Sequence, residues 1–318
     1  MRLKLSSFLQ MKPNLIIYQM LGWKIAFYYI QVLGHLYFSI KRREKRQIEL
    51  SIQAAFGHFK EKREIAAITR DVFRGVFSHY YEKLFNAYAD IHRLKGFFKR
   101  FVDASTLDRL DKALNKGRGV LFVTGHYGGI EYIPIYLAVR GYPISVIAKF
   151  ATPQLKETLL RRTESLGLRV IDASQKNTIL ASVIKDLKAN RVVFIECDEI
   201  EEWKSSDKKR ISFLGKWVGL DRTITVLQKR SKAELVFGVL HRFSLEKYSF
   251  ILKSYPEIAK HREDADIPSG EVVLKFFEEL VASDPTQWYQ WKNFIDIEPG
   301  ISKKSNENSV STLEPAYT

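Results

Sequence analysis

The chain has 318 residues, of which 46% are hydrophobic and 13% aromatic, so it can bury a core and is not a wholly disordered protein. Its one cysteine, Cys197, excludes an intramolecular disulfide framework and a zinc or iron–sulfur site built from several cysteines. The 51 Lys and Arg residues outnumber the 36 Asp and Glu residues, and a net charge of +15 favours anionic partners: nucleic acid, an anionic membrane or an acidic protein.

The first predicted element is an aromatic-rich segment, residues 15–40, which is long enough to cross a bilayer although polar residues such as Lys24 and His35 interrupt it. The basic run KRREKR follows at residues 41–46. Three interpretations remain open: a single span, a helix lying in the membrane interface over anionic lipid, and a helix packed on the domain. We expect residues 1–43 to form a membrane-associated unit, and no signal-peptide cleavage site follows the segment.

The remaining chain changes from a helical pattern to one of alternating strands and helices. Residues 44–88 carry apolar side chains at a spacing of three to four, which predicts helices. The predicted strands are residues 119–124, 144–148, 168–171, 192–195, 235–240 and 250–252, and the predicted helices between them are 130–140, 154–166 and 177–189. This alternation predicts an α/β fold with a mostly parallel central sheet flanked by helices. We expect one domain over residues 44–298 and a disordered tail over 299–318.

The motif TGHYGGIE, residues 124–131, joins a predicted strand to a predicted helix and so lies at the carboxyl edge of the sheet, where α/β proteins place their active sites. His126 is suited to accept a proton near neutral pH, and Glu131 can fold back to orient it. Gly128 and Gly129 predict a close approach of substrate, with free backbone amides as oxyanion donors. The alternative is a structural histidine that is hydrogen-bonded after a strand.

With the pattern H-x4-E, the chain resembles the late (secondary) acyltransferases of lipid A biosynthesis, the lauroyl and myristoyl transferases of the lysophospholipid acyltransferase superfamily. The resemblance covers about residues 15–296 and includes KGRGVLFVTGHYGGIE, RVVFIECDE and DPTQWYQWKNF. Departures surround the His–Glu pair: Gly129-Ile130 stands for Asn-Trp, Asp198-Glu199 for Asp-Gln, and Phe213-Leu214-Gly215 for Phe-Phe-Gly. These departures affect the expected acceptor and acyl-chain length more than the expected reaction.

The resemblance implies a membrane-associated enzyme that moves a fatty acyl chain from a thioester, such as that of acyl-carrier protein, to a hydroxyl of a lipid A precursor or similar glycolipid. His126 would be the general base and Glu131 would orient it, without an acyl-enzyme, a cofactor or a metal. It also implies the cytoplasmic face of a bacterial inner membrane. The predicted substrate contacts are Gly128, Gly129, Lys149, Arg161, Arg162 and Asp198.

Alternatives remain for several of these residues. Arg161 and Arg162 suit an acceptor's phosphates, or they belong to a solvated helix face. Trp288, Tyr289 and Trp291 are predicted as core anchors in preference to walls of an acyl pocket. A different lipid acceptor, a lysophospholipid or aminolipid, would keep the same site. A non-catalytic protein that binds anionic membranes or nucleic acid would explain the charge, but it leaves the His–Glu pair unexplained, and no nucleic-acid motif is visible.

Overall fold

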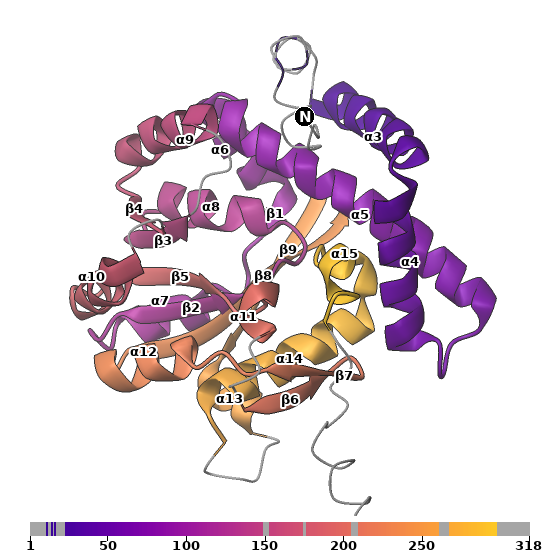
Figure 1. Ribbon diagram of the computed structural model, residues 1–318. Helices are drawn as coiled ribbons and strands as arrows, with labels where there is room; N and C mark the ends of the chain where they lie inside the picture. The colour runs from indigo at the N-terminus through magenta and orange to yellow at the C-terminus, as the bar shows by residue number, and fades with distance from the viewer. Residues whose placement is uncertain are drawn as a thin grey trace, which may run out of the picture.

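The computed structural model describes residues 11, 14, 16, 23–148, 153–173, 176–204, 209–260 and 267–297. The described chain opens with long helices (Figure 1): α3 (Trp23–Ile40), α4 (Arg42–Phe56), α5 (Lys62–Tyr88) and α6 (Ile91–Phe101). The helical pattern predicted for residues 44–88 therefore corresponds to α4 and α5. The predicted tail, 299–318, lies outside the described residues.

A seven-stranded sheet lies at the centre, in the order β1-β9-β8-β2-β5-β3-β4. Neighbouring strands pair in parallel, except that β8 and β9 form an antiparallel hairpin. This confirms the predicted α/β fold with a mostly parallel sheet. The strands are β1 (Val102–Asp103), β2 (Val120–Thr124), β3 (Ile144–Ala148), β4 (Arg169–Asp172), β5 (Val192–Glu196), β8 (Glu234–Ser244) and β9 (Lys247–Ser254).

Helices cover both faces of the sheet. In Figure 1, α8 and α9 lie on the same side as α5, and α10, α12 and α14 lie on the other. The predicted helix 130–140 begins as a 3-10 turn, η1 (Ile130–Tyr132), before α8 (Ile133–Val139). The other elements are α7 (Asp108–Leu114), α9 (Pro153–Ser165), α10 (Lys176–Lys188), α11 (Ile200–Trp203), a separate hairpin of β6 (Arg210–Phe213) and β7 (Lys216–Gly219), α12 (Thr223–Ser231), α13 (Tyr255–Ala259), α14 (Ser269–Ser283), η2 (Pro285–Gln287) and α15 (Trp291–Phe294).

The central strand β2 is buried along its whole length, as expected for an inner strand with layers on both faces. Its neighbours are β5 on one side and β8 on the other. The register places Thr124, the last residue of β2, opposite Glu196, the last residue of β5. The loops that leave these two strands therefore start side by side at the carboxyl edge of the sheet.

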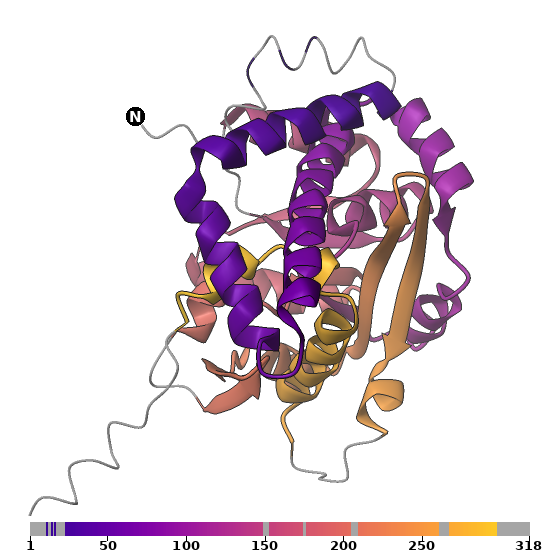
Figure 2. The same cartoon turned by 90° about the vertical axis from the view of Figure 1, so that its right-hand side faces the viewer.

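Helix α3 has one face on the protein and one face exposed (Figure 2). The inner face carries Ala26, Ile30, Gly34 and Phe38 and packs on α5. A Cβ atom at Gly34 would lie 2.3 Å from the Phe77 ring, so this glycine is required for the close packing. The outer face carries exposed apolar residues: Ile25, Tyr28, Val32, Leu36 and Ile40. Within the described residues, no helix combines the length and apolar character needed to cross a bilayer.

Candidate active site

His126 and Asp198 follow the adjacent strands β2 and β5, each two residues beyond the strand end. Nδ1 of His126 lies 3.0 Å from Oδ1 of Asp198, and the His126 amide donates to both carboxylate oxygens, at 3.1 and 3.0 Å. Asp198 is wholly buried, so it holds the imidazole with a proton on Nδ1 and leaves Nε2 for chemistry. Asp198 was expected to contact substrate; the geometry instead makes it the partner of His126.

A second carboxylate lies on the other nitrogen of the imidazole. Oε2 of Glu196 is 3.6 Å from Nε2 of His126, and the two side chains are 31% and 24% exposed. The nearby carboxyl of Glu199 also raises the pKa of Glu196. Donor atoms of His126, Glu196 and Glu199 lie within 4.8 Å of one another, close enough for a cation. His126 and Glu196 already form an ion pair with each other, and we assign the cluster no metal.

The carboxylates change the proton affinity of the cluster. Burial disfavours a charged imidazole, but Asp198 and Glu196 outweigh burial and raise the pKa of His126 to about 10. Burial raises the pKa of Glu196 above its usual value, against the opposing charge of His126. In the ligand-free protein at neutral pH, His126 is therefore an imidazolium, and it must lose a proton before it can act as a base.

Glu131 contacts helix α5. Its Oε1 lies 3.1 Å from Nζ of Lys83 and 3.6 Å from Nε2 of His79, and Asn86 donates to its backbone oxygen at 2.9 Å. The sequence had led us to expect that Glu131 contacts His126. Among the described residues, no hydrogen bond or ion pair joins the two side chains. The reason is topological: α5 supplies a lysine to Glu131, and β5 supplies a closer acid to His126. Burial would raise the pKa of Glu131, but the charge of Lys83 and, more weakly, that of His126 lower it.

His79 is a second histidine beside the site. Its ring packs on Tyr289, with ring centres 4.1 Å apart and planes tilted by 30°. Burial lowers the pKa of His79 to about 3, so the ring is neutral at physiological pH. Its Nδ1 has no hydrogen-bond partner among the described residues. His79 thus contributes a polar wall without contributing charge.

The carboxy-terminal segment of the described chain closes the back of the site. The indole of Trp288 donates to Oδ2 of Asp198 at 2.7 Å, and the Tyr289 amide donates to the His126 carbonyl at 3.0 Å. Nε2 of Gln290 lies 3.3 Å from Nδ1 of His126. Trp288 is wholly buried, as a core anchor should be, and it also positions the acid. The sequence offered one signal for this contact: a tryptophan predicted to be buried needs an acceptor for its N–H group.

A buried ion pair lies under the 126–129 turn. Arg242 of β8 binds Glu82 of α5 through two hydrogen bonds, at 2.6 and 3.0 Å, and donates to the Gly128 carbonyl at 2.8 Å. Tyr248 also donates to Glu82, at 3.0 Å. Sequence analysis missed this pair, since neither residue belongs to a recognisable motif. It links α5 and β8 to the turn that carries His126.

The two glycines of the turn serve packing rather than substrate approach. Gly128 has φ +57°, and a Cβ atom there would lie 2.1 Å from the Leu240 carbonyl oxygen. The amides of Gly128 and Gly129 donate to the carbonyls of Gln287 at 3.0 Å and Leu240 at 2.7 Å. These amides are therefore not free to bind an oxyanion. The expectation of free amides at this turn is therefore wrong, because carbonyls of β8 and η2 accept from both of them.

The remaining predicted residues lie farther from the pair or outside the description. Arg161 is 76% exposed and pairs with Glu157 one turn earlier on α9, which places it on a solvated helix face. Lys149 and the side chain of Arg162 lie outside the described residues. Cys197 is buried as predicted, and burial raises its pKa, so its thiol is not an activated nucleophile.

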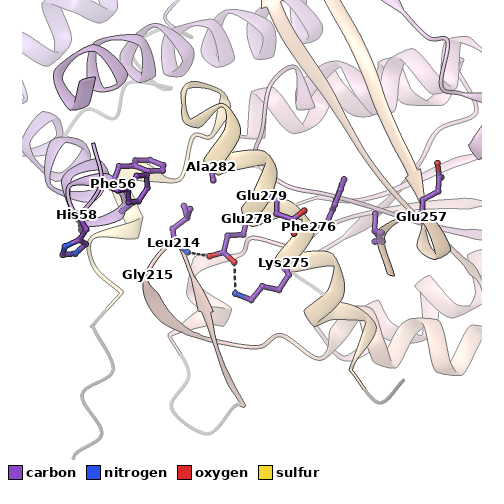
Figure 3. A pocket seen from close by; sticks show the side chains of 14 residues that line it. Phe56, His58, Leu214, Gly215, Glu257, Lys275, Phe276, Glu278, Glu279 and Ala282 are labelled. Carbon is purple, nitrogen blue, oxygen red and sulfur yellow. Dashed lines mark hydrogen bonds and ion pairs between the residues drawn. The ribbon is translucent and has the colours of Figure 1, made fainter. Parts of the chain in front are cut away.

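A groove of about 810 Å³ lies at another part of the surface (Figure 3). Its walls come from the end of α4, the β6–β7 turn and α14, and include Phe56, Leu214 and Phe276. Glu278 accepts the Leu214 amide and pairs with Lys275, which shapes one wall. His126 does not line this groove, so we do not assign it to the chemistry at the sheet edge.

Comparison with known proteins identifies the family. The model of the bacterial lipid A biosynthesis acyltransferases matches residues 13–293, which include both His126 and Asp198. Comparison with curated proteins found no match. The chain belongs to the bacterial lipid A biosynthesis acyltransferase family and is an acyltransferase.

Proposed function

We propose that this protein transfers a fatty acyl chain from the thioester of an acyl-carrier protein to a hydroxyl of a lipid A precursor or similar glycolipid, with His126 as the general base. The observation that carries the proposal is the arrangement of the imidazole: buried Asp198 holds Nδ1 while Nε2 lies at a partly open edge. This is the orientation that a His base needs.

The reaction needs few protein groups because a thioester is already activated. Nε2 of His126 removes the proton as the acceptor oxygen attacks the thioester carbonyl, and Asp198 stabilises the imidazolium that forms. Glu131 acts on His126 by its charge and holds Lys83, whose ammonium is 32% exposed. We assign Lys83 to the developing oxyanion, in place of the glycine amides.

The net positive charge of the protein is the basis for the proposed contacts with the acceptor and the donor. A net charge of +15 suits both an acidic carrier protein and an anionic lipid headgroup. Lys149, Arg161 and Arg162 remain proposed substrate contacts, and the two arginines are suited to acceptor phosphates. Helix α9, which carries the two arginines, packs against α5 and so lies on the same side of the sheet as Lys83.

Attachment to the membrane is proposed through α3. Its five exposed apolar residues repeat every three or four positions, and the basic run 41–46 follows immediately. A helix of this kind lies in the headgroup region with its apolar face toward the acyl chains. We propose peripheral association with the cytoplasmic face of the bacterial inner membrane, which brings a lipid acceptor to the enzyme.

The proposal is tested by His126→Ala, with His92→Ala as the control because His92 is an exposed histidine on α6. Acyl transfer from an acyl-carrier-protein thioester to the lipid A precursor is measured in mixed micelles. We expect His126→Ala to lose about 10²–10⁴ of the rate, the contribution of a positioned general base. Folded His126→Ala protein that retains transfer within a few-fold of wild type overturns the assignment.

A second candidate acceptor, an aminolipid, is favoured by one observation. The carboxyls of Glu196 and Glu199 lie beside the reactive nitrogen, and they suit an ammonium better than a phosphate. Mass spectrometry of lipids from cells with and without the protein separates the two, because the missing product carries either a phosphorylated glucosamine or an amine headgroup.

A further inference from the structure

We propose that Glu196 is a second acid–base residue of the transfer reaction, which takes a proton from His126 when substrates close the site and then gives it to the leaving thiolate. This inference rests on the proposed function and adds to it the origin of the leaving-group proton.

The imidazole of His126 lies between two carboxylates. Asp198 occupies Nδ1 at 3.0 Å and Glu196 faces Nε2 at 3.6 Å, so a carboxylate lies on each nitrogen of one ring. An imidazole in this position holds its Nε2 proton and is not a base. The nearest group that can accept this proton is the carboxylate of Glu196.

Closure of the site by an acyl chain and a lipid acceptor favours the proton shift. Both side chains are partly open to water in the ligand-free protein. Excluding that water disfavours the charged pair and favours neutral imidazole beside neutral carboxylic acid. The neighbouring carboxyls of Asp198 and Glu199 act in the same direction, because both raise the pKa of Glu196 and so favour a proton on it.

The protons then balance over one turnover. The acceptor O–H gives its proton to Nε2 of His126 as the new C–O bond forms at the thioester carbon. The C–S bond breaks, and Glu196 gives its proton to the departing sulfur, which leaves as a thiol. The enzyme returns to imidazolium and carboxylate, its starting state, and no other reactant is needed.

Glu196 is close enough for this role. The acceptor oxygen must lie within hydrogen-bond distance of Nε2, and in the tetrahedral intermediate the sulfur is bonded to the same carbon as that oxygen. A proton donor for sulfur must therefore stand beside Nε2, as Glu196 does.

The charged and polar groups around the pair come from three directions. Asp198 and Glu199 lie on the β5 side, and Glu131, Lys83 and neutral His79 lie on the α5 side. Gln290 approaches from the carboxy-terminal segment. Lys83 interacts with both Glu131 and Glu196. Because carboxylates outnumber the neighbouring cations, one proton is retained on the pair over a wide pH range.

The experiment compares two donors in the Glu196→Gln variant, which keeps the side-chain shape but cannot exchange a proton. One donor is an alkyl thioester of an acyl-carrier protein, and the other is an aryl thioester of the same fatty acid, whose thiolate leaves without protonation. We expect kcat/KM to fall about 100-fold with the alkyl donor and less than about fivefold with the aryl donor. The control, Glu201→Gln, removes an exposed carboxylate of α11, the helix that follows β5, and leaves both rates unchanged.

A pH profile gives a second readout that a merely structural role would not alter. The wild type needs one proton on the pair, so its kcat/KM is bell-shaped. The Glu196→Gln variant needs only neutral His126, so its profile rises to a plateau.

Three results would decide against Glu196. Equal loss with both donors makes it a structural support, and no loss removes it from the reaction. A bell-shaped profile in Glu196→Gln also contradicts the proton exchange. Transfer that persists in His126→Ala overturns the proposed function instead, so the two failures are distinguishable.

Discussion

Two regions of this protein reverse the usual distribution of side chains, and they do so in opposite ways. The outer face of α3 exposes five large apolar residues, whereas the carboxyl edge of the sheet buries the charged residues Asp198, Glu82 and Arg242. An exposed apolar stripe needs a partner outside the molecule, such as a membrane. A buried charge needs a partner inside it, because an isolated ion in a protein interior is far too costly.

The comparison separates what binds the enzyme to its substrate layer from what performs the reaction. Changes on α3 should alter membrane binding without altering stability or chemistry. Changes at the sheet edge should alter chemistry or stability without altering membrane binding. The predictions below test this separation and are given in order of decreasing effect.

Asp198→Asn should lower kcat by about 10³–10⁴, because an amide on Nδ1 no longer fixes the tautomer or stabilises the imidazolium. The backbone and Trp288 hydrogen bonds keep an acceptor oxygen, so the fold should survive. Steady-state transfer and circular dichroism measure the two properties. Glu131→Gln should cost less than Asp198→Asn, and the reverse order would restore Glu131 as the main partner of His126.

Arg242→Leu should lower the free energy of unfolding by about 3–5 kcal/mol, since it leaves Glu82 buried and unpaired. The double variant Glu82→Leu/Arg242→Leu should recover most of that loss, because no unpaired charge remains. Denaturant unfolding measures both. If the double variant is as unstable as the single one, burial of an unpaired charge is not the cause.

Val32→Glu should weaken vesicle binding by roughly tenfold, because burying one such apolar side chain is worth about 1.5–3 kcal/mol. Stability should change by less than about 0.5 kcal/mol, as for other surface substitutions. Flotation with vesicles that contain anionic phospholipid measures binding. Trp217→Ser is the matched control, an exposed aromatic on β7 at the opposite end of the molecule (Figures 1 and 2). Equal weakening in both variants would contradict α3 as the membrane face.

His126 should also make stability depend on pH. Its folded pKa is raised from 6.5 to about 10, so its stabilising contribution is complete below pH 6.5 and disappears as pH rises toward 10. The difference in Tm between wild type and His126→Gln should therefore shrink over that interval. A difference that grows with pH would mean that the folded protein favours the neutral ring.

Much of the fold was predictable because the patterns behind it are local. The predicted strands 119–124 and 144–148 are short apolar runs, and the structure has strands at 120–124 and 144–148. The 3-10 turn at η1 and the β6–β7 hairpin were missed, since neither leaves a period in the sequence. His126 could be placed at the sheet edge because a strand precedes it and a helical segment follows it.

The sequence by itself determined the elements, the turn that carries His126 and the apolar stripe of α3, because each depends on residues a few positions apart. Only the tertiary structure decided which charges meet. Asp198 reaches His126 across 72 positions, Lys83 reaches Glu131 across 48 and Glu82 reaches Arg242 across 160. These contacts follow from the order of strands in the sheet and from the place of α5 beside it. Each buried charge needs a partner that comes from a distant part of the chain, so no local pattern encodes these pairs.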